Sequence, residues 1–266
     1  MCILSGAPER VSDTQILAFR TKDGNHQVTV YANRVSLRTR STEFIPWGQP
    51  GGNNTCAMVL PYPSYGTFKL DCEMIDTSGA PNLFKSLDGL FPVTYATDGR
   101  GRRGGFGAGD TLEIKSCGSY DYSIVPTLSD LVRLDPSLHI GDVIGLLRRS
   151  YPVGYSFMVC AIRESAAYHP IAYRHALRTD GLLFLPTLHE HGPELRGAAM
   201  WDHAIYTLDA TPPPAFDTER IDVSATDVAN AIGPALGKQL RTGTNMMCKT
   251  TIQGERANED ILIPCF

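Results

Sequence analysis

Several features that would classify a protein quickly are missing from this chain. Its seven cysteines include no Cys-x-x-Cys pair, and an odd, scattered set of this kind is typical of reduced thiols rather than of a disulfide framework or a zinc ribbon. No apolar run reaches membrane-spanning length, and the first residues lack the basic and apolar regions of a signal peptide. The sequence therefore predicts a cytoplasmic or otherwise intracellular protein with no membrane segment.

An excess of positive charge is also missing. Lys and Arg number 24 against 28 Asp and Glu, which gives a formal net charge of −4 and argues against a general nucleic-acid binder, because such proteins need a basic face. Hydrophobic residues make up 42% and charged residues 20% of the 266 residues, as in ordinary globular proteins. We expect a single globular domain over residues 1–266.

The hydrophobic patterns predict more strands than helices. No internal repeat is visible, and strands do not alternate regularly with helices as in βαβ units, so we predict an α+β fold with a mixed or largely antiparallel sheet and a few short helices. An Asp-Gly turn predicts a hairpin from the first two strands, and Pro61-Tyr62-Pro63 is expected to stop the third. The expected strands are 14–20, 27–33, 56–60, 111–115, 120–125, 155–163, 171–177, 182–188, 204–208 and 246–252, and the expected helices are 82–90, 127–134, 142–149 and 225–236.

Two segments are candidates for contact with partners. Residues 98–109 contain six glycines and three arginines and almost no apolar bulk, which predicts a surface insertion outside the core. The tract is similar to arginine-glycine RNA-binding segments, but it is single and short, whereas such segments act as arrays. The run Thr211-Pro212-Pro213-Pro214 is the second candidate, so we expect protein partners to be contacted through 98–109 and 211–214.

Histidines gather in the second half of the chain. On a strand, His189 and His191 would project from one face about 7 Å apart, and a short return of the chain would place His203 on a neighbouring strand. Three imidazoles form the ligand set of an open zinc or iron site, which Glu194 or Asp202 could complete. Alternatively, His203 with Asp202 would act as base and orienting group for a thiol. A third interpretation leaves the histidines solvated or structural.

Cys2 is the candidate nucleophile. If Met1 were removed, the thiol and the free α-amine would sit on adjacent atoms, and the amine could serve as the base. The start of the chain resembles the bile-salt and penicillin V acylases, in which an N-terminal Cys is followed by Arg-x-x-Asp; here Arg20 and Asp23 occupy those positions. The stretch from His189 to Glu194 is similar to the first cupin motif, without the second motif. A buried, structural Cys2 is the alternative.

Several motifs in order resemble an uncharacterised family of bacterial and other microbial proteins. The resemblance spans most of the chain up to about residue 208 and treats the arginine-glycine tract as an insertion. It implies a single domain and no known activity. The matching stretches are Met1-Cys2-Ile3-Leu4-Ser5-Gly6, Thr14-x-Ile16, Ala57-Met58-Val59-Leu60-Pro61-x-Pro63, Pro126-Thr127-Leu128-x-Asp130-Leu131-x-Arg133-Leu134, His169-Pro170-x-Ala172, Phe184-x-Pro186-Thr187-x-His189-x-His191 and Asp202-His203-x-x-Tyr206.

Two functions from different classes are consistent with these features. The first is an intracellular hydrolase or transferase with a Cys/His site of Cys2, His203 and Asp202, assisted or not by a metal ion on His189, His191 and His203. The second is a non-catalytic structural or assembly protein of a larger complex, in which the histidines have no chemical role. A concave site that brings Cys2 to a histidine would favour the first function.

Overall fold

The computed structural model describes residues 3–5, 8, 10–36, 55–64, 71–91, 112–138, 140–141, 143–163, 168–190 and 194–266. Most of these residues lie in strands that pair largely antiparallel, and the helices are short, which confirms the α+β prediction at this level while the balance is strongly towards β. Across the described ranges, every helix is too short or too polar to cross a membrane. Cys2, His191 and the tract 98–109 lie outside the described residues.

A seven-stranded sheet forms one half of the molecule, in the order β12-β13-β11-β2-β3-β9-β5. Its neighbours pair antiparallel except β11 and β2, which run parallel. The predicted hairpin is confirmed as β2 and β3, whose turn contains Gly24 at φ +74°. The strands are β2 Arg10–Arg20, β3 His26–Ser36, β5 Cys72–Ile75, β9 Ile171–Ala176, β11 Ala198–Leu208, β12 Asp217–Ser224 and β13 Thr244–Ala257.

A second, five-stranded sheet is fully antiparallel, in the order β1-β4-β8-β7-β6. Its strands are β1 Ile3–Leu4, β4 Thr55–Pro63, β6 Lys115–Cys117, β7 Tyr120–Val125 and β8 Tyr155–Arg163. β4 continues through Pro61 and Pro63, so the prediction that these prolines end the strand was wrong. The physical reason is that, among the described residues, β1 pairs with β4 only at Met58 and Val59, so neither proline lies opposite a described residue of β1 that would need its missing N–H.

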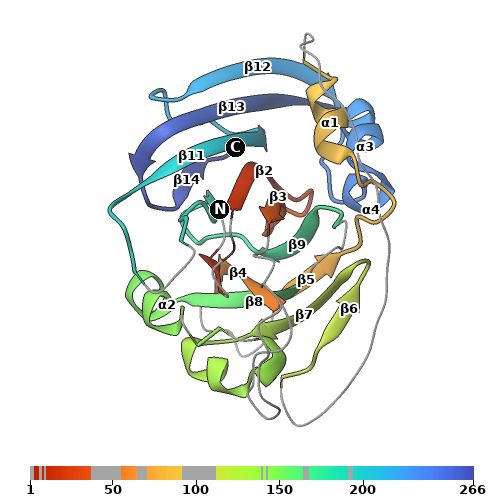
Figure 1. Ribbon diagram of the computed structural model, residues 1–266. Coiled ribbons are helices and arrows are strands. Elements are labelled where there is room, and N and C mark those ends of the chain that lie inside the picture. Colours follow the sequence, from red (N-terminus) through yellow and green to blue (C-terminus); the bar gives the residue numbers. More distant parts are fainter. Residues whose placement is uncertain are drawn as a thin grey trace.

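The two sheets face each other across the main core (Figure 1). Alternation along β4 illustrates this: Cys56, Met58 and Leu60 enter the core between the sheets, whereas Ala57 and Val59 point to the opposite face. A small third sheet of β10 (Leu182–Leu185) and β14 (Ile261–Pro264) adds apolar residues to the same core.

Helices cover the outer face of each sheet, so the molecule has four layers. Figure 1 shows α1, α3 and α4 gathered on one side of the seven-stranded sheet. The predicted helix at 127–134 is a 3-10 helix, and the one at 225–236 is interrupted at Gly233, where φ is +84°. The helices are α1 Leu83–Asp88, α2 Ile144–Ser150, α3 Ala225–Ile232 and α4 Pro234–Gly237, and the 3-10 helices are η1 Leu128–Arg133 and η2 Pro136–Leu138.

The strands β8, β9, β10 and β11 follow one another along the chain, but among the described residues none of them pairs with the next. β8 pairs with β4 and β7 in one sheet, whereas β9 pairs with β3 and β5 in the other. β10 pairs with β14, and β11 pairs with β13 and β2. The connections therefore cross between sheets, which local patterns do not reveal because pairing partners are chosen by the packing of both faces.

Candidate functional site

His189 lies in an irregular segment and not on a strand, so the expected strand geometry for His189 was wrong. β10 ends at Leu185, and Pro186 has no N–H with which to continue a ladder. Glu190 then forms an isolated parallel bridge with Ile3, and the Leu4 N–H donates to the Glu190 carbonyl at 3.1 Å. The segment therefore runs beside the beginning of the chain.

Side chains between β13 and β14 hold this segment in place. The side-chain oxygen of Asn258 accepts the His189 N–H at 2.7 Å, and its amide donates to the His189 carbonyl at 3.1 Å. The Asp260 carboxylate accepts the Leu188 N–H at 2.8 Å and the Tyr151 hydroxyl at 2.6 Å. Burial raises the pKa of Asp260, and these hydrogen bonds act in the opposite direction by stabilising the carboxylate. Irregular backbone can be buried here because its polar groups have partners.

Glu190 is a buried carboxylate that the sequence analysis missed. It accepts hydrogen bonds from the Asn258 amide and the Arg196 N–H, both at 2.7 Å, and pairs with the Arg196 guanidinium at 3.0 Å. A buried carboxylate is tolerated only when it is paired and hydrogen-bonded, and Glu190 meets that condition. Its role in the described contacts is to fasten the loop that leads from Glu190 to β11.

His203 and His189 do come together, although their chain segments are not paired strands. Their ring centroids are 6.2 Å apart, and the Trp201 ring lies 4.5 Å from that of His203. The prediction that His203 lies on a strand adjacent to that of His189 was wrong, because β13 and β2 occupy both sides of β11. The approach of the two rings comes instead from the crossing of the irregular segment over the inner face of β11.

Burial keeps His203 neutral. Its exposed fraction is 1%, and removal from water lowers its pKa far below the ordinary value, with smaller contributions from the N-terminal amino group and from His189. The backbone N–H of Asp202 donates to Nδ1 of His203 at 3.2 Å, so the neutral ring carries its proton on Nε2. The described contacts thus favour a fixed tautomer that donates from Nε2.

The Asp202 carboxylate supports β2 and does not orient His203 by a hydrogen bond. One oxygen accepts the Asp13 N–H at 2.8 Å, and the other lies 3.8 Å from His203 Nδ1. Asp13 sits in a bulge of β2 with φ +54°, and its carboxylate pairs with Arg34 at 3.0 Å. Neighbouring residues of a strand point to opposite faces, which separates Asp202 from His203.

The predicted metal site and the predicted thiol site each contain a residue outside the described ranges. Among the described residues, no three His, Cys, Asp or Glu side chains are placed so that they could hold a metal ion. Because His191 and Cys2 are not described, the zinc or iron site and the role of Cys2 as nucleophile remain predictions. The bridge between Ile3 and Glu190 brings the residue after Cys2 beside the residue after His189.

His169 joins the two sheets through hydrogen bonds on both ring nitrogens. Nδ1 lies 2.8 Å from the Thr77 hydroxyl, Nε2 accepts the Ser119 N–H at 3.0 Å, and the His169 carbonyl accepts the Tyr120 hydroxyl at 2.5 Å. Thr77 precedes α1, and Ser119 lies in the turn between β6 and β7. In these contacts His169 has a structural role: it connects the segment that leads into α1 to the turn between β6 and β7.

A second set of contacts fixes the end of α1. The Asp88 carboxylate accepts the Tyr206 hydroxyl at 2.6 Å and pairs with the Lys249 ammonium at 2.7 Å. That ammonium lies 6.0 Å from the centre of the Phe91 ring, which is buried. Residues 89–91 are therefore held against the seven-stranded sheet by one carboxylate, one cation and one aromatic ring.

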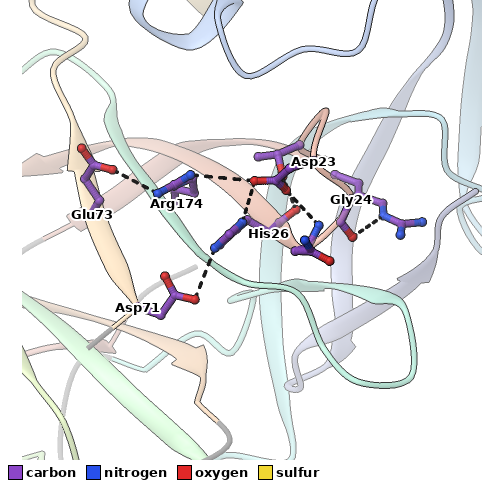
Figure 2. A network of polar contacts seen from close by, with 9 residues as sticks. Asp23, Gly24, His26, Asp71, Glu73 and Arg174 are labelled. Carbon is purple, nitrogen blue, oxygen red and sulfur yellow. Dashed lines mark hydrogen bonds and ion pairs between the residues drawn. The ribbon is translucent and has the colours of Figure 1, made fainter. Parts of the chain in front are cut away.

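A third polar network ties the edge strand β5 to the β2–β3 hairpin (Figure 2). His26 lies between two carboxylates, with Nδ1 3.0 Å from Asp23 and Nε2 3.3 Å from Asp71. Arg174 pairs with Glu73 at 3.4 Å and lies 4.0 Å from Asp23. The sequence analysis missed this network, although opposite charges on neighbouring strands could have signalled it once the pairing was known.

Comparison with known proteins adds only distant structural neighbours. No protein-family model matches the chain, and no curated protein matches it. Among solved structures, a mutated baculovirus P35 after caspase cleavage has a TM-score of 0.46 at 10% identity and covers 97% of this chain and 98% of its own. Baculovirus P35 has a TM-score of 0.44 at 10% identity, and the match covers 100% of this chain and 99% of P35. The match to the caspase-8/P35 complex has a TM-score of 0.45 at 8% identity and covers 96% of this chain and 96% of that chain. We draw nothing about fold or function from likeness at this level.

Proposed function

We propose that this protein is a non-catalytic component that binds another protein through residues 98–109. The observation that supports this proposal is the fastening of both described flanks of that stretch. Before it, Asp88 and Phe91 are fixed on the seven-stranded sheet by Tyr206 and Lys249. After it, the β6–β7 turn is fixed by its hydrogen bond to His169.

Fixed flanking structure of this kind suits a segment that binds a partner. Binding loops in many proteins are carried by a rigid scaffold, and a scaffold that does not reorganise lowers the entropy lost on association. The His169 contacts also join the segment that leads into α1, at Thr77, to the turn that follows β6, at Ser119.

The composition of 98–109 suggests the chemistry of the partner. Three arginines and one aspartate give this stretch a local positive charge in a chain of net charge −4. Guanidinium groups bind carboxylates through two parallel hydrogen bonds, so the partner surface should be acidic.

Residues 211–214 are the weaker second candidate. Pro212 is buried, and the backbone N–H of Thr211 donates to the Pro264 carbonyl. Of the four residues, Thr211 and Pro214 are exposed and could contact a partner.

The contacts around the histidines are consistent with this proposal. Glu190 is paired with Arg196, Asp202 supports the β2 bulge, and His203 is enclosed and neutral. Glu190 and Asp202 therefore have structural roles in the folded protein.

The test compares three versions of the full chain as bait in an extract of the source cells. One is unchanged, one carries Arg100→Glu, Arg102→Glu and Arg103→Glu, and one carries Arg10→Glu, Lys22→Glu and Arg256→Glu as a matched control on exposed positions. We expect the control to retain a specific partner in a stoichiometric complex by size-exclusion chromatography and the first triple variant to lose it by at least 10-fold in Kd. Equal binding by both variants would contradict the proposal.

A thiol enzyme is the second candidate, favoured by the bridge that aligns Ile3 with Glu190, next to His189. A nucleophilic Cys2 would have its thiolate stabilised and would react with iodoacetamide at neutral pH faster than the other six cysteines. Mass-spectrometric labelling of the native protein measures those rates directly. Slow labelling of Cys2, with Met1 retained in the intact mass, would end this candidate without affecting the binding proposal.

A further inference from the structure

We propose that Thr14, Trp201 and His203 line a buried site for a small neutral molecule that carries a carbonyl oxygen. The proposal is independent of protein binding through 98–109. It concerns the inner face of β2 and β11, close to where the segment of His189 crosses.

The three side chains share one face of two adjacent strands. Thr14 is aligned with His203 in the parallel pairing of β2 and β11, and Trp201 precedes His203 by two residues on β11. Residues two apart on a strand project to the same side. The neighbouring Ile16 and Ile205, also aligned, both lie in the core between the sheets, which identifies this as the inner face.

Three polar atoms on this face, within the described residues, are buried with no hydrogen bond. One is the hydroxyl oxygen of Thr207, further along β11. The two nearest to His203 along the strands are the indole nitrogen Nε1 of Trp201 and the hydroxyl oxygen of Thr14, on side chains that are 4% and 0% exposed. Buried polar groups nearly always have partners, since an unmade hydrogen bond is expensive away from water. Two such atoms beside one histidine therefore indicate an absent acceptor.

The chemistry of the wall selects a neutral acceptor. An indole N–H can only donate, a hydroxyl can donate, and the neutral His203 ring, whose centre lies 4.5 Å from that of Trp201, carries its proton on Nε2. Arg34 and Arg196 on the adjoining segments are paired with Asp13 and Glu190. Burial of a carboxylate on this face would cost more free energy than burial of an amide or ketone oxygen, which would accept from both donors.

An open position lies on the β13 side of Trp201. Gly254 is the residue opposite Trp201 in the β11–β13 pairing, with φ +84°. Within the described part of the chain, no atom lies within 4 Å of the position that a Cβ would take there. Gly254 is half-buried, so this position is near the surface, and we expect a small molecule to enter from this side.

The first measurement needs no ligand. Thr14→Val keeps the shape of the side chain and removes a hydroxyl that has no partner, so we expect the Tm to stay unchanged or to rise by about 2–4 °C. Thr250→Val is the matched control, because the Thr250 hydroxyl shares a hydrogen bond of 3.0 Å with Thr218, and its loss should lower the Tm. A lower Tm for Thr14→Val would show that the hydroxyl already has a partner and would overturn the proposal.

The second measurement uses the cyclic amide 2-piperidone as a probe at millimolar concentration. The chain has two tryptophans, so Trp201→Phe assigns the indole N–H signal of Trp201 in a proton–nitrogen NMR spectrum. We expect the probe to shift that signal downfield, and Thr14→Val to weaken binding by up to about 10-fold. Sodium acetate should leave the signal unchanged.

Two results of the second measurement would also overturn the proposal. One is an indole signal that does not respond to 2-piperidone up to about 50 mM, near the weak limit expected for so small a molecule. The other is magnetisation transfer from a long-lived bound water to the indole N–H with no probe effect, which would identify an ordered water only. Neither result bears on binding through 98–109, so the two proposals fail separately.

Discussion

At the scale of single residues, the contacts of Gly118 and His169 show how a position without a chemical role can be strictly specified. Gly118 has φ +57°, and a Cβ built there would lie 1.9 Å from Nε2 of His169. The turn between β6 and β7 thus requires glycine for two separate reasons: backbone conformation and the space taken by the imidazole. The imidazole in turn needs this approach to accept the Ser119 N–H.

Gly118→Ala should therefore destabilise the protein strongly. The added methyl forces either the turn or His169 to move and strains a left-handed residue, and we expect a loss of about 2–4 kcal/mol in the free energy of unfolding by urea denaturation. Gly79→Ala is the control, because no atom of the described residues lies within 4 Å of its Cβ position and its φ is not in the left-handed region. Its effect should stay within about 0.5 kcal/mol. Similar effects at the two positions would contradict the close packing of His169.

At the scale of elements, β5 illustrates how a short edge strand is retained. Its four residues pair only with β9 among the described strands, so its backbone bonds alone hold it weakly. The network of Figure 2 adds side-chain contacts from Asp71 and Glu73, which flank Cys72, to His26 and Arg174. Since β5 leads through Thr77 to α1, this network and the His169 contacts act on consecutive stretches of one chain.

Asp23 should make the stability of this region depend on pH. Partial burial opposes its ionisation, but hydrogen bonds from the Asn25 N–H, the Thr21 hydroxyl and His26 outweigh burial and lower its pKa from 3.8 to about 2. A depressed pKa in the folded state stabilises the fold above pH 3.8, and this contribution is lost as the pH falls from about 4 to 2. The carboxylate is two-fifths exposed, so the effect should remain below about 1 kcal/mol.

Urea unfolding at pH 5, 3 and 2 measures this contribution by comparison of variants. Asp23→Asn should lower the stability at pH 5 and lie much closer to the wild type at pH 2, because about half of the folded wild-type protein then carries a protonated Asp23 and most of the contribution is lost. Asp217→Asn, at an exposed position of β12, serves as the control. A constant difference between wild type and Asp23→Asn across this pH range would refute the assignment of the pKa shift to folding.

At the scale of the whole molecule, neighbouring cores share the same strands, so the layers should unfold together. Each sheet contributes one face to the core between the sheets and the other to a core beneath helices, so strands such as β4 and β2 belong to two cores at once. Chain connections also cross repeatedly between the sheets, as from β8 to β9. Loss of one layer would expose apolar faces of the next.

Differential scanning calorimetry should therefore record a single unfolding transition with equal calorimetric and van't Hoff enthalpies. That outcome would support the prediction of one domain over residues 1–266. Two separated transitions would instead mean that the sheets unfold independently.

Deletion of 98–109 should leave the Tm nearly unchanged, since so little apolar bulk can be buried by that tract.

The elements that local physical chemistry specifies were predictable from the sequence. The β2–β3 hairpin follows from two apolar runs joined by Asp-Gly, and the helix at α3 begins where Ser224 accepts the Asp227 N–H as an N-cap. The strong β character follows from β-branched and aromatic runs. In each case the information lies within a dozen neighbouring residues.

Contacts between distant segments were decided only by the tertiary structure. The strand pairings, the passage of β4 through two prolines, the burial of Glu190 and the approach of His189 to His203 all depend on which segment packs where. The sequence determined that His189, Asp202 and His203 are close along the chain. The fold assigned Asp202 to the β2 bulge and His203 to the interior, because adjacent residues of a strand face opposite sides and only the assembled sheets determine which side is buried.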